Sequence, residues 1–311
     1  MENIKDVVLD FLNHCKYEKN LSIKTLKAYK IDLQQLQDFI ARKKHSIKTS
    51  EISKIIIREY LQEISNLKPK TIKRKVATMK AMFNFLEYED TIAVNPFRKM
   101  KIQIREPKSL PNVMTISEIE QIIRSTYKQK SGIQRKSYAY AESIRNVAVI
   151  ELLFATGARV SELSNLKEEF IDLASGIVKV RGKGNKERII QICNKETLEA
   201  LKYYKKIFHK KIPNCDGYFF VNRRNQKLSE QSIRFLVKQV AKIAGLERRI
   251  TPHSFRHSFA TLLLEQDVDI KYIQQFLGHS SIMTTQIYTH VNVEKQKQIL
   301  QRHPRRSFHV G

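Results

Sequence analysis

Hydrophobic positions in the first hundred residues recur every three or four residues, which is the period of an α-helix with one buried face. The pattern predicts four helices: one near the N-terminus, one behind an N-capping Ser22, one over residues 53–64 and one from Pro69 onward. The fourth helix turns a basic face outward, which carries Lys70, Lys73, Arg74 and Lys80. We therefore predict a helical domain over residues 1–95.

Between residues 96 and 112 the helical period disappears. Asn95-Pro96, Pro107 and Pro111 interrupt it, and arginines and lysines are interspersed among them. The segment is predicted to be an extended basic linker that runs along a partner instead of hanging free in solvent.

From residue 113 to residue 311 the pattern predicts a second, mixed domain. Two β-branched runs flank Gly182-Lys183-Gly184-Asn185 and predict a β-hairpin. The remaining expectations are a helix capped by Ser117, a polar surface loop over 128–143, helices over 144–155, 195–211, 229–244 and 292–300, a helix holding His253 and Arg256, and a short strand over 218–221. The predicted fold class is mainly α with a small antiparallel β-sheet.

Composition adds a partner to this outline. The 311 residues include 57 Lys or Arg against 31 Asp or Glu, which gives a net charge of +26 and a pI near 9.9. Both halves of the chain are basic, so the charge is not one disordered tail. An excess of this size is typical of a protein that binds a polyanion, and it predicts double-stranded DNA as the partner.

The same composition argues against other classes of protein. The chain has no apolar run long enough to span a bilayer and no apolar stretch of a signal peptide at its start. Cys15, Cys193 and Cys215 are scattered, odd in number and without metal-ligand spacing. We therefore expect a reduced, cytoplasmic protein without a membrane partner, a metal site or another cofactor.

The candidate chemistry is concentrated near the C-terminus. His253-Ser-Phe-Arg256-His257 is followed by Leu277-Gly-His279 and then by Tyr288. An arginine can hold two non-bridging phosphate oxygens, histidines can donate and accept protons, and a phenol can attack phosphorus. The set suits reaction at a phosphodiester.

Three rival functions fit these residues less well. A zinc hydrolase helix with His253 and His257 would need a glutamate after the first histidine, where Ser254 stands. The sequence also has no Asp/Glu cluster for a two-metal nuclease. A DNA-binding regulator without catalysis has no reason to keep Tyr288 together with two arginines, Arg159 and Arg256, and the hairpin lysine, Lys183.

Five stretches of the second half resemble the tyrosine recombinase (integrase) family, and specifically its Xer branch. They are Glu151 to Leu163 (ELLFATGARVSEL), Val180 to Arg188 (VRGKGNKER), His253 to Ala260, Leu277 to Ser280 and Thr284 to Val291. Likeness extends to residues 21–33 and 303–305. The chain departs from the family in a 128–143 connection that looks longer than usual and in residues that continue past the tail motif to Gly311.

The resemblance implies covalent DNA strand exchange. Tyr288 would attack the scissile phosphate and leave a 3′-phosphotyrosyl link with a free 5′-hydroxyl. Arg159 and Arg256 would hold the non-bridging oxygens and stabilise the transition state. Because the bond energy is kept in the link, no ATP is needed.

The remaining roles that the resemblance implies concern proton transfer and support. Lys183 would protonate the departing 5′-oxygen, since an alkoxide is a poor leaving group. His253 would assist proton transfer at the nucleophile, and His279 would hydrogen-bond the phosphate. Glu162, one turn after Arg159, would orient a neighbouring side chain.

For the whole molecule, the resemblance implies a two-domain DNA clamp. A core-binding, SAM-like domain over 1–95, with Lys70, Lys73 and Arg74 as DNA contacts, would join a catalytic domain over 113–311 through the basic linker. Four protomers would assemble on two duplexes, two on each recombination site, with a C-terminal helix at about 292–301 exchanged between neighbours. The Xer likeness favours chromosome dimer resolution, with a septal DNA translocase or a second recombinase as further partners. Integration or excision of a mobile element, plasmid resolution and a type IB topoisomerase stay open as alternatives.

Overall fold

The computed structural model describes residues 3–45, 48–105, 113–131, 133–134, 137–181, 187–210, 212–213, 215–278, 298 and 300–301. The chain divides into two compact units, Met1–Ser109 and Leu110–Gly311. No described helix is both long and apolar enough to cross a membrane.

The N-terminal unit is a helical bundle whose helices start where the sequence provides caps. The side chains of Asn3, Ser22 and Ser53 each accept a hydrogen bond from the first turn of a helix, and Pro69 opens another. The elements are α1 (Ile4–Tyr17), α2 (Ile23–Arg42), the 3-10 helix η1 (Thr49–Glu51), α3 (Lys54–Glu63) and α4 (Pro69–Tyr88). The four predicted helices are confirmed.

The start of the predicted linker contacts this bundle. Phe97 is buried in the core of the N-terminal unit, and Met100, Ile102 and Ile104 pack against the same core with part of their surface. These apolar side chains alternate with exposed basic ones such as Lys101 and Arg105. Residues 96–105 therefore lie against the bundle, while 106–112 fall outside the described residues.

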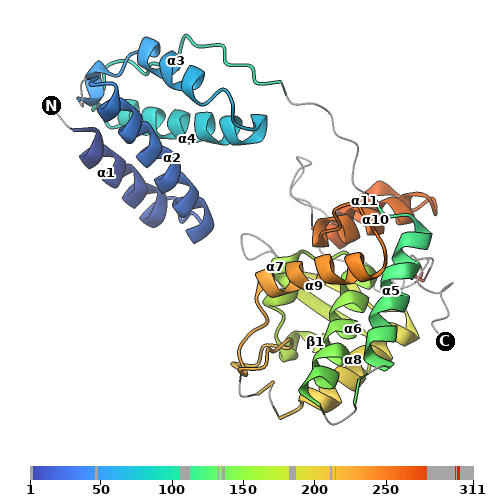
Figure 1. Ribbon diagram of the computed structural model, residues 1–311. Helices are drawn as coiled ribbons and strands as arrows, with labels where there is room; N and C mark the ends of the chain where they lie inside the picture. Colours follow the sequence, from blue (N-terminus) through green and yellow to red (C-terminus); the bar gives the residue numbers. More distant parts are fainter. Residues whose placement is uncertain are drawn as a thin grey trace. The chain divides into compact units, whose positions relative to one another are not determined.

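The second unit wraps helices around α6 (Tyr138–Thr156), which is buried along most of its length and packs against its neighbours α5, α8 and α10 (Figure 1). The other helices are α5 (Ile116–Ser131), α7 (Val160–Ser164), the 3-10 helix η2 (Glu168–Phe170), α8 (Lys195–Phe208), α9 (Glu230–Ile243), α10 (Pro252–Leu264) and α11 (Ile270–Leu277). The sheet order is β1-β2-β3, with strands Ile171–Asp172, Ile177–Arg181 and Glu187–Gln191, all antiparallel. The predicted hairpin and the mainly helical fold class are confirmed.

The predicted loop over 128–143 is wrong for most of its length. α5 continues to Ser131, and α6 begins at Tyr138 with Ser137 as its N-cap. Polar composition hid these helices: Lys128 is exposed, whereas Tyr127 and Tyr140 pack against the core, and the Lys130 ammonium lies over the Tyr127 and Tyr203 rings. The Tyr140 hydroxyl also hydrogen-bonds that of Tyr203 on α8, at 3.0 Å.

Two smaller expectations are also corrected. The predicted strand at 218–221 forms only isolated bridges, Lys167 with Tyr218 and Val221 with Lys227. α5 starts behind Thr115, whose backbone and hydroxyl exchange hydrogen bonds with Glu118, and not behind Ser117. α11 had no counterpart in the sequence prediction. The helix expected over 292–300 lies outside the described residues, apart from 298 and 300.

A buried carboxylate joins α2 to α4 in the N-terminal unit. Asp32 is 1% exposed and accepts hydrogen bonds from Arg74, from the Lys75 ammonium at 3.2 Å and from the Thr78 hydroxyl at 3.1 Å. Lys75 is itself 3% exposed. A buried cation without its counter-ion is costly, so this pair fixes how the two helices pack.

We predict that Asp32→Ala lowers the free energy of unfolding by about 3–5 kcal/mol, because Lys75 stays buried without its carboxylate. Urea unfolding of the full chain, followed by helical circular dichroism, measures the change. Asp38→Ala removes an exposed carboxylate from the same helix, and should cost no more than about 0.5 kcal/mol. Equal losses for the two variants would contradict the prediction.

Candidate active site

A glycine turn places Arg159 at the start of α7. α6 ends at Gly157, which adopts φ +56°, and a Cβ at this position would lie 2.8 Å from the Phe259 ring. Only glycine fits this combination of left-handed backbone and close contact. The chain then turns so that Arg159 becomes the residue before α7, and its backbone N–H donates to Glu162 at 2.7 Å.

Arg256 reaches the same turn from α10. Thr251 caps this helix and Pro252 opens it, while Phe255 and Phe259 anchor its buried face. Arg256 is 5% exposed, and its guanidinium donates to the carbonyl of Gly157 at 2.9 Å and to the carbonyl of Leu277. His253 lies in the first turn of α10 and is exposed.

The end of α11 collects three guanidiniums. Its last residues present carbonyl groups that lack partners within the helix. The Phe276 carbonyl accepts from Arg188 Nε at 2.6 Å, the Leu277 carbonyl accepts from Arg256, and the Gly278 carbonyl accepts from Arg159 Nη2 at 3.0 Å. Arg159 and Arg256, predicted from sequence to act together, therefore meet at this helix end.

One carboxylate balances part of this positive charge. Glu162 accepts from Arg159 Nη1 at 2.8 Å and from both terminal nitrogens of Arg188 at 2.7 Å. Burial alone would raise the pKa of Glu162, but the hydrogen bonds and charges of Arg188 and Arg159 outweigh it, and the pKa is lowered. Glu162 is therefore ionised at neutral pH and paired with two arginines.

Two cationic groups of the site, Arg256 and His253, have lowered pKa values. Burial, followed by the charge of Arg159, lowers the pKa of Arg256 to about 9. Partial desolvation, and then the charges of His257 and Arg256, lower the pKa of His253 below its ordinary 6.5. An anion bound between these side chains would raise both pKa values, and at neutral pH His253 is free to accept a proton.

Family models match both units of the chain. Residues 112–295 match the phage integrase family, and residues 8–90 match the phage integrase N-terminal SAM-like domain. The chain belongs to the phage integrase family. This confirms the resemblance that the sequence motifs predicted, and the two-part plan of a helical, SAM-like region followed by a catalytic one.

Curated relatives agree with this family. The chain is 44% identical over 311 residues to a tyrosine recombinase of Agathobacter rectalis, covering 99% of this chain and 100% of the relative. It is 35% identical over 301 residues to tyrosine recombinase XerC of Thermodesulfovibrio yellowstonii, covering 94% of each. The solved XerH recombinase bound to its difH substrate in a pre-cleavage complex has a TM-score of 0.68 at 24% identity, over 94% of this chain and 83% of that chain, and shares the fold. The chain is thus a tyrosine recombinase, a site-specific enzyme that breaks and rejoins DNA.

Not every predicted site residue of this recombinase is described. Lys183, His279 and Tyr288 lie outside the described residues. Among the three predicted DNA contacts of α4, Arg74 forms an ion pair with the buried Asp32 through one guanidinium nitrogen. Its side chain is still 44% exposed. In the part of the chain that the structure describes, no group of three His, Cys, Asp or Glu side chains is placed to hold a metal ion.

A basic cavity adjoins the recombinase site. It has a volume of about 1180 Å³ and reaches from α9 to His253; its basic lining includes Arg234, Lys238 and Lys242. These three side chains recur at i, i+4 and i+8 on α9, so this basic helix face could have been predicted from the sequence. Phe235, 58% exposed, lies on the same helix.

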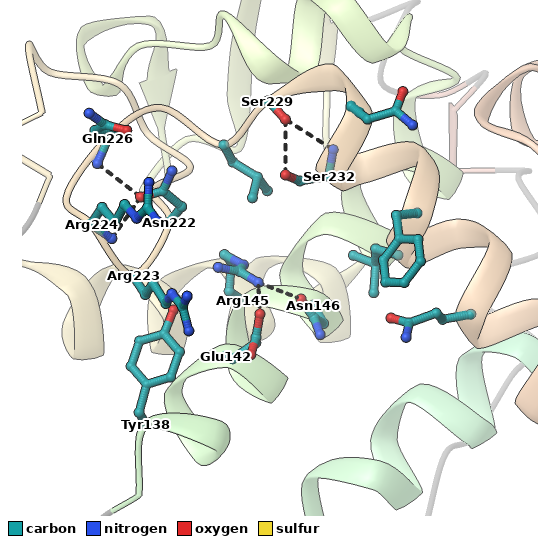
Figure 2. Close-up of a pocket in the computed structure, with 15 residues that line it drawn as sticks. Tyr138, Glu142, Arg145, Asn146, Asn222, Arg223, Arg224, Gln226, Ser229 and Ser232 are labelled. Atoms are coloured by element: carbon teal, nitrogen blue, oxygen red, sulfur yellow. Dashed lines mark hydrogen bonds and ion pairs between the residues drawn. The ribbon is translucent and has the colours of Figure 1, made fainter.

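A second cavity, of about 550 Å³, continues along α9 because it shares Gln231 and Phe235 with the first. Figure 2 shows Arg145 in this cavity, linked to Glu142 and Asn146, with Tyr138, Arg223 and Arg224 around it. Arg223 and Arg224 stand on a turn closed by Asn222, whose side chain accepts from the Arg224 backbone at 2.8 Å. Sequence analysis missed these arginines, as it missed Arg188.

The lowered pKa of His253 predicts how DNA cleavage depends on pH. As pH falls, His253 keeps its neutral, proton-accepting form below pH 6.5, so the acidic limb of the single-turnover cleavage rate should lie below that value. His257→Asn removes the largest electrostatic cause of the shift and should move the limb upward. His209→Asn, at the end of α8, is the control and should leave the profile in place. A limb that does not respond to His257→Asn would contradict this assignment.

Proposed function

We propose that this recombinase exchanges DNA strands through a 3′-phosphotyrosyl intermediate formed by Tyr288. The bond from the phenolic oxygen to phosphorus forms as the bond from phosphorus to the 5′-oxygen breaks. The phenolic proton passes to His253, and Lys183 gives a proton to the departing 5′-oxygen. One phosphodiester replaces another, so rejoining by the reverse step requires no cofactor.

The observation that carries this proposal is the convergence of Arg159 and Arg256 beside His253. Two guanidiniums held by the same helix end can bind the two non-bridging oxygens of a single phosphate. The charge of the pentavalent transition state is stabilised most by donors that are already in place. We assign His279, which follows Gly278 directly, to a further hydrogen bond with this phosphate.

We propose that the duplex lies along the two cavities beside α9. Arg234, Lys238 and Lys242 offer phosphate contacts in the first cavity, and Arg223 and Arg224 offer them in the second. Exposed Phe235 is suited to apolar contact with a thymine methyl group. In the N-terminal unit, the basic face of α4, with Lys70, Lys73 and Arg74, supplies further DNA contacts.

The biological role that we propose is Xer-like resolution of chromosome dimers in the cytoplasm. Support comes from likeness to a XerC protein over nearly the whole chain and from the fold shared with a difH-bound XerH. A septal DNA translocase or a second recombinase is the partner that this role implies. Sequencing of the DNA trapped by the protein in its host would separate dimer resolution from integration of a mobile element, because the two act at different sites.

Exchange between two duplexes cuts four strands, so we propose a homotetramer with two protomers on each site. A helix at about 292–301 would couple neighbours by docking on the next protomer. Leu300 is 5% exposed and belongs to the apolar core of the second unit. This burial supports a tail that needs an apolar pocket, and exchange would offer the same pocket on a neighbour.

Tyr288→Phe tests the chemistry directly. The substitution keeps the ring and removes the attacking oxygen, so half-site DNA binding should persist and the covalent protein–DNA adduct should vanish. The adduct is detected on nicked half-site DNA in the presence of a chelator, by denaturing electrophoresis. Tyr272→Phe, on α11, is the matched control and should still form the adduct. An adduct with Tyr288→Phe would show that another residue is the nucleophile.

The proposed acid has a test of its own. Lys183→Ala should slow cleavage of ordinary DNA by about two to four orders of magnitude, as expected for a lost general acid. DNA with sulfur in place of the bridging 5′-oxygen releases a thiolate that requires no protonation, so this substrate should restore much of the rate. Single-turnover cleavage of both substrates measures the effect, with Lys179→Ala on β2 as the control. Equal slowing on both substrates would refute the acid role.

A further inference from the structure

Arg188 is tied into the active site but takes no part in the proposed mechanism. It lies on β3, and its two terminal nitrogens donate to the two oxygens of Glu162 at 2.7 Å. Its Nε donates to the Phe276 carbonyl at 2.6 Å. Its side chain is 11% exposed, and that of Glu162 is 1% exposed, so the pair is shielded from water.

Glu162 connects this pair to Arg159. Each carboxylate oxygen accepts one hydrogen bond from Arg188 and one from Arg159, whose backbone N–H and Nη1 are the donors. A buried carboxylate requires partners for both oxygens. Since Arg188 occupies one position on each oxygen, the Arg159 guanidinium makes only a single contact with Glu162.

Because Arg159 and Arg188 share the Glu162 carboxylate, one edge of the Arg159 guanidinium stays available for a substrate. Nη1 of Arg159 binds Glu162, and Nη2 binds the Gly278 carbonyl. The other N–H groups of its guanidinium have no partner among the described residues, and its side chain is 32% exposed. Without Arg188, Glu162 could take Arg159 in a two-bond fork, which would turn these donors away from a substrate.

We infer that Arg188 is a positioning residue that holds Arg159 with a free donor edge for the scissile phosphate. The inference rests on the proposed function, in which Arg159 binds that phosphate. Arg188 never touches the DNA itself. It acts by saturating Glu162 and by anchoring the end of α11 at Phe276.

Gly278 supports the same arrangement. A Cβ on this residue would lie 3.2 Å from Arg188 Nη1 and 3.3 Å from its Cδ, and φ is +61°. Both the backbone conformation and the passage of Arg188 therefore favour glycine. The glycine before His279 and the arginine at the start of β3 serve one geometric requirement.

Arg188→Lys tests the inference, because an ammonium keeps the charge and cannot form the two parallel bonds to Glu162. Half-site DNA binding should change by less than about twofold, whereas single-turnover cleavage should fall by about ten- to a hundredfold, as expected for a misplaced catalytic group. Arg188→Met, which also removes the charge, should lower cleavage further. Thermal unfolding of both variants reports any general loss of structure.

A neutral substrate separates positioning from general structural damage. A methylphosphonate at the scissile position lacks one charged oxygen, so its cleavage depends less on Arg159. If Arg188 positions Arg159, the Arg188→Lys defect should be large on phosphate and small on methylphosphonate. Arg248→Lys breaks a similar pair in the same unit, with Glu118 at 2.6 and 2.5 Å, and should leave the ratio of the two rates unchanged.

Two outcomes overturn the inference, and they are distinguishable. If Arg159→Lys shows the selective loss on phosphate and Arg188→Lys slows both substrates equally, Arg188 does not act through Arg159. If Arg159→Lys itself cleaves both substrates like the unaltered protein, the proposed role of Arg159 fails, and the inference fails with it.

Discussion

The C-terminal end of α11 is the constraint on which the geometry of the catalytic unit depends. A helix leaves its last carbonyl groups without intrahelical partners and carries partial negative charge there. Three consecutive carbonyls, those of Phe276, Leu277 and Gly278, each accept from a different guanidinium. These guanidiniums come from β3, α10 and the turn before α7. One helix end therefore brings together three segments that are far apart in sequence, and it offsets their mutual repulsion.

The positive charge of the three guanidiniums is only partly neutralised, and a DNA-cleaving enzyme can use the remaining charge. Glu162 pairs with Arg159 and Arg188, while backbone carbonyls hold Arg256, so this cluster of three arginines and one carboxylate retains a positive excess. Burial and the charge of Arg159 lower the pKa of Arg256 to about 9, because both disfavour the charged guanidinium. A phosphodiester would reduce the excess and gain more from it as its charge grows in the transition state.

Sequence predicted the parts of the site that depend on local rules. Ser22 predicted the start of α2, and the spacing of His253 and Arg256 placed both on one helix. The contacts that tie these elements together escaped it. Arg188 and Glu162 are 26 residues apart. This separation matches no helix or strand period, so only the folded chain brings the two side chains together. The bond from Arg74 to the buried Asp32 was not predicted either, because the helical pattern places Arg74 on an exposed basic face.

Recognition and chemistry are joined through α9. This helix presents Arg234, Lys238 and Lys242 to the larger cavity, and its opposite face packs against α7 and α10. Arg159 immediately precedes α7, and Arg256 lies in the second turn of α10. A phosphate bound on the exposed face of α9 is therefore at a fixed distance from the arginine pair, because only packed helices lie between them. Binding at the correct position along the duplex would by itself bring the scissile phosphate to the free edge of Arg159.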